Sequence, residues 1–309
     1  MSAKLTDEGY ICYNSPMKIM FLNGGLANQM FQYTFYRFGQ IMNQHDDWYL
    51  DDSFFFVNDI HNGYELNKVF GLHPNLLSEY FDEEVWAYMI EEKKKGKSIA
   101  ELLLENDIDI RMISEYGNWK QWNPFSGDVK ELGREFEESF VKEDGNIYYN
   151  GYGLKSVFFK KIEKAILPEF CFPEIADERN RDYLDEIQGT NSCSLHVRRG
   201  DFVALGGAAP DDLYRSMIEE ILKKEPDTTL FLFSDDLPYC DAHRKEMGLE
   251  LPDRVVFIEG NSGETAFRDM QLMSHCKNMI VGNSSFPFMA SLLNRDVKTI
   301  LTFRNDRYI

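Results

Sequence analysis

The sequence predicts an α/β protein whose parallel strands form doubly wound sheets. Short apolar runs alternate with segments of helical periodicity over most of the chain, and this alternation is typical of parallel sheets joined by right-handed crossovers. The run at 228–234 (TTLFLFS) is almost continuously apolar, as expected of a strand that helices cover on both faces. In such a sheet, ligands bind outside the carboxyl ends of the strands.

The N-terminal half begins with a strand, a glycine turn and a helix. Residues 18–23 (KIMFLN) form an apolar run that ends at Gly24 and Gly25. The next segment has an apolar residue at every third or fourth position: Phe31, Phe35, Phe38 and Met42. This spacing predicts a helix with one apolar face.

The rest of this half is less regular. The pattern of apolar and charged residues at 86–106 predicts one or two helices, with the lysine run at 93–95 on a solvated face. Residues 118–127 (NWKQWNPFSG) have the composition of a loop with several aromatic side chains. These side chains either fill the core or form a wall that faces a sugar, and the sequence leaves both interpretations open.

The C-terminal half alternates more clearly. We expect strands at 191–199, 228–234, 254–260, 278–285 and 298–303, and helices at 209–225, 263–276 and 285–293. Asp211 or Asp212 is the expected N-cap of the first of these helices, and Pro287 falls close to the first turn of the last. A charged stretch with two prolines, at 167–182, separates the halves. We therefore expect domains at 1–172 and 173–309.

The bulk composition limits the class of partner. The 309 residues carry a formal net charge of −19, so nucleic acid or an anionic membrane is not expected as the main partner. A small anionic ligand remains compatible, because a few nearby arginines outweigh a distant overall charge. The five cysteines are scattered, without CxxC spacing: Cys12, Cys171, Cys193, Cys240 and Cys276.

These cysteines predict reduced thiols in a cytoplasmic protein, with neither a disulfide framework nor a zinc site. Residues 1–16 contain no apolar signal region, and nowhere do eighteen apolar residues run together. We therefore expect neither a cleavable signal nor a membrane-spanning helix.

Four polar clusters fall at the ends of predicted strands: GGLANQ at 24–29, HVRRGD at 196–201, SDD at 234–236 and NSSF at 283–286. Strand alternation places His196 and Arg198 on one face, away from the apolar layer. The forked guanidinium groups of Arg198 and Arg199 suit a diphosphate leaving group. The alternative is an internal ion-pair network with Asp201. We favour a functional role, because a buried network contributes little net stability.

The serine and aspartate clusters each allow two interpretations. Ser284 and Ser285 offer hydroxyl and backbone N–H groups to a phosphate at a helix N-terminus, or they simply cap that helix. One of Asp235 and Asp236 accepts hydrogen bonds from a nucleobase or ribose, and the other caps the next turn. Because the arginines already supply positive charge, we expect no required metal ion.

The first cluster, GGLANQ, is not the GxGxxG fingerprint of dinucleotide-binding proteins. Gly24 and Gly25 still allow the backbone to approach a ligand closely. Asn28 and Gln29 are helix caps or amide contacts to sugar hydroxyls. The histidines show no metal-ligand spacing, and the absence of GxSxG argues against covalent hydrolase chemistry.

Taken together, the motifs at 24–39, 196–203, 230–236 and 269–286 resemble the α-1,2-fucosyltransferases of glycosyltransferase family 11. The resemblance covers the first α/β unit and most of the C-terminal half, whereas 45–145 resembles little. It implies two Rossmann-like domains facing across a cleft (a GT-B-like fold), with helical insertions in the N-terminal, acceptor-side domain. It also implies a GDP-β-L-fucose site in the C-terminal domain, and metal-independent, inverting transfer to the 2-hydroxyl of galactose.

The resemblance also assigns roles to residues. Arg198 contacts the β-phosphate, and Asp201 and His196 are the candidates for a general base, although a loose transition state needs only a weak base or a water. The expected donor-binding residues are Arg198, Arg199, Asp235, Asp236, Asn283, Ser284, Ser285 and Phe286. The expected acceptor side of the cleft is formed by Gly24, Gly25, Asn28 and Gln29.

Two segments depart from the family pattern. PFMASLLN at 287–294 replaces the usual SWWGAWLN, and GYGLKSVFF at 151–159 matches GYWQSEKYF only loosely. The smaller apolar groups either repack a helix or reshape a surface that faces a sugar. The expected setting is a bacterial, cytoplasmic enzyme that decorates a galactose-terminated or lipid-linked glycan, with peripheral membrane association left open. The alternatives are another nucleotide sugar or acceptor, or a binding protein without transfer activity.

Overall fold

The computed structural model describes residues 15–117 and 119–303. The chain divides into two compact units, residues 1–171 and 172–309, one residue before the boundary expected from the sequence. Each unit contains one five-stranded sheet, and the strand pairs of both sheets are parallel. The predicted α/β class is confirmed.

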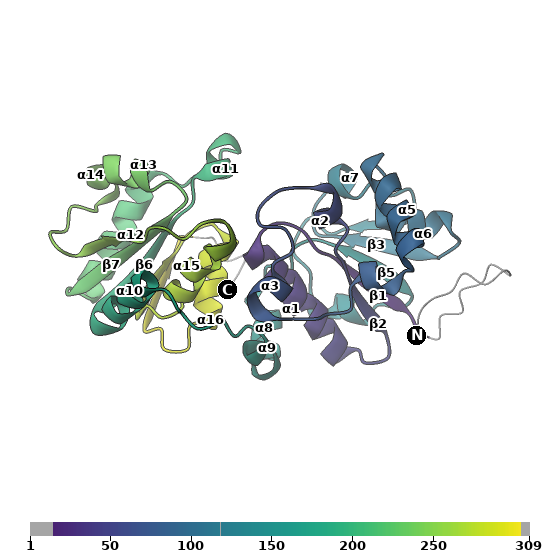
Figure 1. Ribbon diagram of the computed structural model, residues 1–309, viewed down its shortest axis with the longest axis horizontal. Helices are drawn as coiled ribbons and strands as arrows, with labels where there is room; N and C mark the ends of the chain where they lie inside the picture. The colour runs from purple at the N-terminus through teal and green to yellow at the C-terminus, as the bar shows by residue number, and fades with distance from the viewer. Residues whose placement is uncertain (1–14, 118, 304–309) are drawn as a thin grey trace. The chain divides into compact units, whose positions relative to one another are not determined.

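The first unit has the strand order β2-β1-β5-β3-β4 (Figure 1). Its strands are β1 Met17–Phe21, β2 Asp47–Asp51, β3 Ile110–Ser114, β4 Val129–Glu131 and β5 Asn146–Asn150. Its helices are α1 Leu26–Met42, α2 Phe54–Val57, α3 Leu66–Phe70, α4 Leu77–Tyr80, α5 Glu83–Lys94, α6 Ile99–Glu105, α7 Trp119–Trp122, α8 Ser156–Lys161, α9 Glu163–Glu169 and the 3₁₀ helix η1 Glu138–Lys142. The strand order reverses between β1 and β5, which is the position where sheets of this kind bind ligands.

The second unit has the strand order β10-β9-β6-β7-β8. Its strands are β6 Asn191–Val197, β7 Thr228–Ser234, β8 Val255–Phe257, β9 Asn278–Val281 and β10 Thr299–Thr302. Its helices are α10 Glu178–Gly189, α11 Gly200–Ala204, α12 Asp211–Lys224, α13 Leu237–Ala242, α14 Arg244–Met247, α15 Phe267–Met273, α16 Ser285–Leu293 and the 3₁₀ helix η2 Gly263–Thr265. Here the order reverses between β6 and β9.

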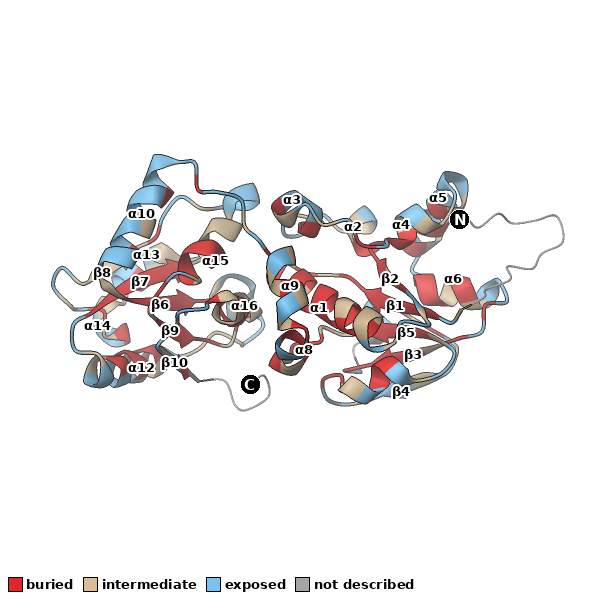
Figure 2. Ribbon diagram, turned by 90° about the horizontal axis from the view of Figure 1, so that it is seen from below, coloured by how far each residue is buried: buried red, intermediate tan, exposed pale blue. Residues whose placement is uncertain are grey.

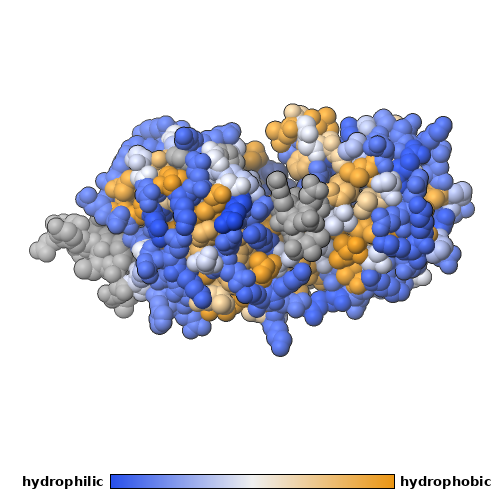
Figure 3. All heavy atoms as spheres, turned by 180° about the vertical axis from the view of Figure 1, so that it is seen from behind, coloured by the Kyte–Doolittle hydropathy of each residue, from blue (hydrophilic) through white to orange (hydrophobic). Residues whose placement is uncertain are grey.

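Helix α1 is central to the core of the first unit. Phe31, Phe35 and Phe38 of its predicted apolar stripe are buried, whereas Met42 at its end is exposed. Phe35 packs its ring against the rings of Trp48, Phe136, Tyr149 and Phe158. Gly39 permits this packing, because a Cβ there would lie 2.2 Å from the Trp48 indole. In both units the central strands are buried, whereas the outer faces of many helices are exposed (Figure 2). The face seen in Figure 3 is mostly hydrophilic with apolar patches between, as the charge of the chain predicts.

Some local predictions are wrong. The N-cap of α12 is Pro210, and Asp211 begins the helix instead. Residues 86–106 form two helices as expected, but Lys93 is buried, whereas Lys94 and Lys95 are exposed. Within residues 119–127, Phe125 lies in the core, as the first interpretation expects, and Trp122 is 42% exposed. That this segment faces a sugar stays a prediction.

The cysteine and membrane predictions were made for the whole chain. Cys193, Cys240 and Cys276 are buried free thiols, Cys171 is exposed, and Cys12 lies outside the described residues. Within residues 15–117 and 119–303, no helix is long and apolar enough to cross a membrane.

Glu115 is a fully buried carboxylate that holds the loop after β5. Its oxygens accept hydrogen bonds from the backbone N–H groups of Phe136 (2.7 Å), Tyr152 (2.6 Å) and Gly153 (3.2 Å). Burial raises the pKa of Glu115 to about 7 despite these bonds. Gly151 is required beside it, because a Cβ there would lie 2.4 Å from the carboxylate.

We predict that Glu115 makes the first unit less stable as the pH rises from about 4.5 to 7. In this window the folded protein binds the carboxyl proton more tightly than the unfolded chain, so the free energy of unfolding falls with increasing pH. Glu115→Gln flattens this slope and costs about 1–3 kcal/mol, because its amide NH₂ cannot accept from the backbone donors. Denaturant unfolding at several pH values measures both effects. A slope unchanged in Glu115→Gln would contradict the assignment.

Candidate active site

The motifs HVRRGD and NSSF follow neighbouring strands. β6 leads into Arg198, β9 leads into Asn283, and the two strands pair in parallel. Both motifs therefore flank the point where the strand order reverses, the ligand-binding position of a doubly wound sheet.

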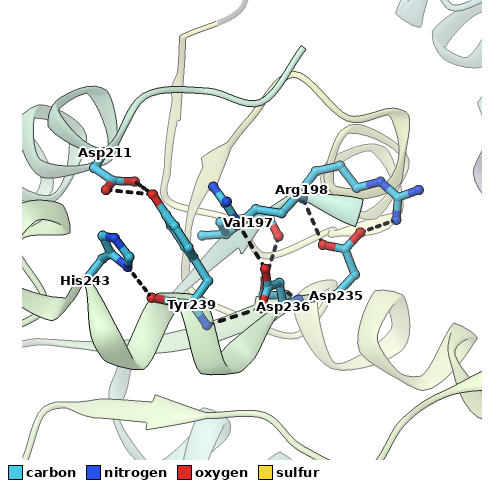
Figure 4. Close-up of polar contacts among 9 residues, drawn as sticks. Val197, Arg198, Asp211, Asp235, Asp236, Tyr239 and His243 are labelled. Carbon is cyan, nitrogen blue, oxygen red and sulfur yellow. Dashed lines mark hydrogen bonds and ion pairs between the residues drawn. The ribbon is translucent and has the colours of Figure 1, made fainter. Parts of the chain in front are cut away.

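Arg198 lies between two carboxylates at the carboxyl end of β6. Its Nη1 is 2.6 Å from Asp235 Oδ2, and its Nη2 donates to Asp201 Oδ1 at 2.7 Å. The second oxygen of Asp235 accepts from the backbone N–H of Arg199 at 2.8 Å. Asp235 therefore joins the end of β7 to the end of β6 (Figure 4). The side chain of Arg198 remains 28% exposed.

Arg199 points to the opposite side and is held by helix α13. Its Nε lies 3.3 Å from Asp236 Oδ2, and its Cζ lies 3.1 Å from the centre of the Tyr239 ring. The His243 ring also stacks on Tyr239, at 3.8 Å, and the Tyr239 hydroxyl donates to Asp211 at 3.0 Å (Figure 4). Asp236 caps α13 by accepting from the backbone N–H of Tyr239, as expected for one of the two aspartates.

The ion-pair network considered from the sequence is present in part: Arg198 pairs with Asp201, whereas Arg199 pairs with Asp236 instead. The observed network is larger. It contains two guanidinium groups, Arg198 and Arg199, and three carboxylates, Asp201, Asp235 and Asp236. These pairs are partly exposed, and such pairs stabilise a protein by about 0–1 kcal/mol each. An anion that displaces a carboxylate from Arg198 therefore lowers the free energy of unfolding only slightly. The network and an anion site are compatible.

His196 is buried, with 9% of its surface exposed, and its ring packs 5.7 Å from that of Phe286. Burial, together with the charge of Arg198, lowers the pKa of His196 to about 3. The imidazole is therefore neutral near pH 7, and its pKa is poorly matched to proton abstraction at that pH. A neutral imidazole can still accept a proton, so the general-base role expected for His196 stays a prediction that its low pKa does not favour.

The serine turn confirms the capping interpretation for one residue. Ser284 is the N-cap of α16, and its Oγ accepts from the backbone N–H of Phe286 at 3.3 Å. Asn283 donates its side-chain amide to the carbonyl oxygen of Gly207 at 2.6 Å. This bond ties the turn to the segment that follows HVRRGD. Ser285 is the first residue of α16.

The glycine cluster lies at the switch point of the other sheet. Gly24 has a φ of +77°, a left-handed conformation suited to glycine, and Gly25 is the N-cap of α1. Asn28 is half-buried in the first turn. Gln29 is fully buried, and its amide bonds the carbonyl oxygens of Gly24 (2.9 Å) and Gly63 (2.8 Å).

In a third hydrogen bond, Gln29 Oε1 accepts from the backbone N–H of Glu65 at 2.8 Å. All of these bonds are internal, so the expected contact between Gln29 and an acceptor sugar is wrong. Its role is to hold the segment around 63–65 against the start of α1.

Two carboxyl groups with raised pKa values were not predicted from the sequence: half-buried Asp269 and buried Asp52. Asp269 in α15 accepts from Asn261 at 2.8 Å, and burial raises its pKa to about 7. Asp52, directly after β2, accepts from the Ser78 hydroxyl at 2.6 Å, and burial raises its pKa to about 6. Asp269 begins the matched motif DMQLMSHC, and Asp52 follows an apolar strand. The sequence shows only where these two aspartates lie, and neither position indicates that the carboxyl group is shielded from solvent.

The departure at 287–294 is explained by packing. Phe288 and Met289 are buried in the second unit, with 6% and 0% of their surfaces exposed. These two residues therefore repack a helix rather than reshape a surface. Leu292 is half-buried.

Among residues 15–117 and 119–303, no group of three or more His, Cys, Asp or Glu side chains is arranged to hold a metal ion.

Two parallel α/β units, with an arginine pair at the switch point of the second, form an architecture in which ligands bind at the strand ends. A sequence model of glycosyl transferase family 11 matches residues 147–307, more than half of the chain. The chain therefore belongs to glycosyltransferase family 11, and it is a glycosyltransferase.

Two curated relatives from Escherichia coli match along most of their length. An alpha-1,2-colitosyltransferase is 26% identical and covers 88% of this chain and 86% of its own. The O-antigen biosynthesis glycosyltransferase WbnK is 27% identical and covers 88% of this chain and 89% of its own. These relatives fit biosynthesis of a bacterial surface glycan.

Solved structures of the fucosyltransferase NodZ from Bradyrhizobium have a similar fold. One has a TM-score of 0.51 at 14% identity and covers 94% of this chain and 96% of its own. A second, the NodZ alpha-1,6-fucosyltransferase co-crystallized with GDP, has a TM-score of 0.50 at 15% identity and covers 95% and 96%. At this identity the likeness shows the fold, which is the GT-B fold expected from the sequence.

We predict that Asp201 orients Arg198 and does not act as a base. Asp201→Asn keeps an oxygen that accepts from Arg198 Nη2, so kcat is expected to stay within about threefold of wild type. Loss of a general base instead costs about 10²–10⁴-fold. Steady-state kinetics with saturating donor and acceptor distinguish the two roles.

Asp201→Ala is the matched control, because it removes both the accepting oxygen and any base. The prediction requires Asp201→Ala to be slower than Asp201→Asn. Equal, large losses in both variants would show that Asp201 takes the proton.

Proposed function

We propose that this glycosyltransferase moves L-fucose from GDP-β-L-fucose to the 2-hydroxyl of a galactose residue, with inversion and without a metal ion. The observation that carries the proposal is Arg198, a partly exposed guanidinium group at the switch point of the second sheet. Its fork matches two oxygens of a diphosphate, as it now matches the oxygens of two aspartates. The resemblance to α-1,2-fucosyltransferases and the α-1,2 linkage in the name of the colitosyltransferase support the choice of reaction.

In the proposed reaction, the bond between the sugar C1 and the β-phosphate oxygen breaks, and GDP leaves with the electron pair. The acceptor hydroxyl attacks C1 from the opposite face, and its proton passes to a base or to water. Arg198 meets charge that grows on the departing oxygen only in the transition state, which lowers the barrier without tightening substrate binding equally. Arg199, held by Asp236 and Tyr239, fixes the turn that carries Asp235.

The remaining donor contacts follow from the positions of the motifs. Ser285 and Phe286 begin α16 beside Arg198's strand end, and the helix N-terminus favours phosphate. Asn283 and Ser284 shape that turn through their own hydrogen bonds. We assign Asp235 and Asp236 to the nucleoside end of the site. We place the acceptor in the first unit, near Gly24, Gly25 and Asn28.

A second donor is favoured by the relative named as an α-1,2-colitosyltransferase. Colitose is the 3-deoxy form of L-fucose, so the two GDP-sugars differ by one hydroxyl. A site that hydrogen-bonds this hydroxyl rejects the deoxy sugar, whereas an apolar site accepts both. Incubation with each GDP-sugar, with and without a galactoside, distinguishes these donors by GDP release. Binding of GDP without turnover of either would identify a protein that binds without transfer.

We further propose that the acceptor is a galactose-terminated oligosaccharide or a lipid-linked glycan of a bacterial surface polymer, and that the enzyme acts in the cytoplasm. The O-antigen relative supports this setting. Peripheral association with a membrane fits a lipid-linked acceptor.

We predict that Arg198→Ala lowers kcat by about 10²–10³-fold, because it removes a fixed cation from the leaving group. The measurement is GDP release at saturating GDP-fucose and galactoside. Arg215→Ala is the matched control, since Arg215 bonds the carbonyl oxygens of Lys245 and Glu246, away from the strand ends. Turnover of Arg198→Ala near wild type would overturn the role.

Metal independence gives a separate prediction. The rate is expected to be unchanged by EDTA, because guanidinium groups, not a divalent ion, offset the diphosphate charge. An EDTA-sensitive rate that Mg²⁺ or Mn²⁺ restores would contradict this part of the proposal and leave the transfer itself intact.

A further inference from the structure

The guanidinium group of Arg199 is held on one side and has unpaired donors on the other. Its Nε lies 3.3 Å from Asp236 Oδ2, and its Cζ lies 3.1 Å from the centre of the Tyr239 ring. Within the part of the chain that the structure describes, neither Nη1 nor Nη2 of Arg199 donates a hydrogen bond to another residue. Both Nη groups of Arg198, by contrast, face carboxylates. Four N–H donors of a permanent cation are therefore left for a ligand or for water.

Tyr239, on which Arg199 rests, is itself fixed at its ring and at its hydroxyl. The His243 ring stacks on the Tyr239 ring with 3.8 Å between their centres. Because Arg199 also lies this close to the ring centre, the two groups occupy opposite faces. The hydroxyl donates to Asp211 Oδ2 at 3.0 Å (Figure 4). Tyr239 lies in α13 after β7, and Asp211 begins α12 after β6, so two helices hold the ring in place.

A side chain held in this way is prepared to bind an anion. A long side chain loses rotamer freedom when a ligand orders it, and a side chain that is already ordered avoids this loss. The aromatic face restrains the Arg199 guanidinium while its N–H groups stay available for hydrogen bonds. The side chain is 17% exposed, and neither Nη atom is fully enclosed by protein. A ligand therefore reaches these donors from solvent.

We propose that Tyr239 and Asp211 are positioning residues for the donor, because they hold Arg199 with both Nη groups available to the diphosphate oxygens of GDP. This inference rests on the proposed function. The fork of Nη1 and Nη2 matches two phosphate oxygens, and Arg199 follows β6 at the edge of the sheet where ligands bind. In the proposed function, Arg198 exchanges a carboxylate for phosphate, whereas Arg199 binds the diphosphate without giving up a partner.

The test is the binding of GDP to the full chain, measured by isothermal titration calorimetry. Tyr239→Leu removes the ring, and we expect the Kd for GDP to rise about tenfold. We expect kcat at saturating GDP-sugar and the KM for the acceptor to stay within about twofold of wild type, because the ring contacts neither the reacting atoms nor the acceptor. A defect of the fold would instead lower all of these together.

Conservative variants separate the ring from its hydroxyl. Tyr239→Phe keeps the aromatic face and loses only the bond to Asp211, so the Kd is expected to rise by no more than about threefold. Asp211→Ala is expected to match Tyr239→Phe, because both remove the same hydrogen bond.

A double-mutant cycle tests whether the ring acts through the guanidinium. Arg199→Leu is expected to raise the Kd for GDP at least about tenfold, because it removes the fork. In that background, Tyr239→Leu is expected to have no further effect, since the two residues form one unit. Losses that add in the double variant would overturn the inference, as would a Kd unchanged in Tyr239→Leu.

Arg244→Leu is the matched control. Arg244 has the same two kinds of contact as Arg199: its Nε donates to Asp241 at 2.7 Å, and its Cζ lies 4.5 Å from the centre of the Phe257 ring. We expect this variant to bind GDP as wild type does.

Thermal unfolding of each variant checks that the fold is intact. Should Tyr239→Leu unfold, Arg199→Lys provides the answer, because it keeps the charge and loses the fork. We expect its Kd for GDP to rise at least about fivefold, and an unchanged Kd would overturn the inference. A wild type that binds GDP but transfers sugar from neither GDP-fucose nor GDP-colitose would instead overturn the proposed function alone.

Discussion

A guanidinium group between two carboxylates is the interaction on which the second unit's site depends. Arg198 is held by Asp201 from its own turn and by Asp235 from the next strand. A free arginine fork at a strand end samples many rotamers, and two carboxylates restrict it to one position. In the proposed function, a phosphate oxygen of the donor replaces at least one of these carboxylates on Arg198, a cation that is already in place.

The fold makes this exchange possible through strand order. β6 lies at the centre of its sheet, with β7 and β9 on either side. The aspartates after β7 consequently meet the arginines after β6, and the serine turn follows the neighbouring strand β9, although the three segments are far apart in the chain. Burial of His196 and of α16 beneath this edge keeps the strand ends together. In the first unit, a glutamate and two amides perform the equivalent structural work: Glu115, Gln29 and Asn123.

The fold class and the grouping of the motifs were predictable, because hydrophobic periodicity directly records burial along strands and helices. Strand alternation also placed His196 and Arg198 on the correct face. The groups that individual side chains contact in the folded protein were harder to predict. The bond from Gln29 to Gly63, the burial of Lys93 and the raised pKa of Asp52 each depend on segments that meet only in three dimensions. A glutamine after a glycine turn has the same sequence signal whether its amide faces a ligand or the core. The sequence also could not distinguish an ion-pair network around Arg198 from an anion site, because an arginine held by carboxylates is already in position to bind an anion.

The most direct test of the account is a crystal structure of the protein with GDP bound. The account predicts that the Arg198 guanidinium leaves at least one of Asp201 and Asp235 and donates to oxygens of the β-phosphate. It also predicts that Arg199 remains stacked on Tyr239. A complex in which Arg198 keeps both aspartates, while the diphosphate binds elsewhere, would contradict the central claim.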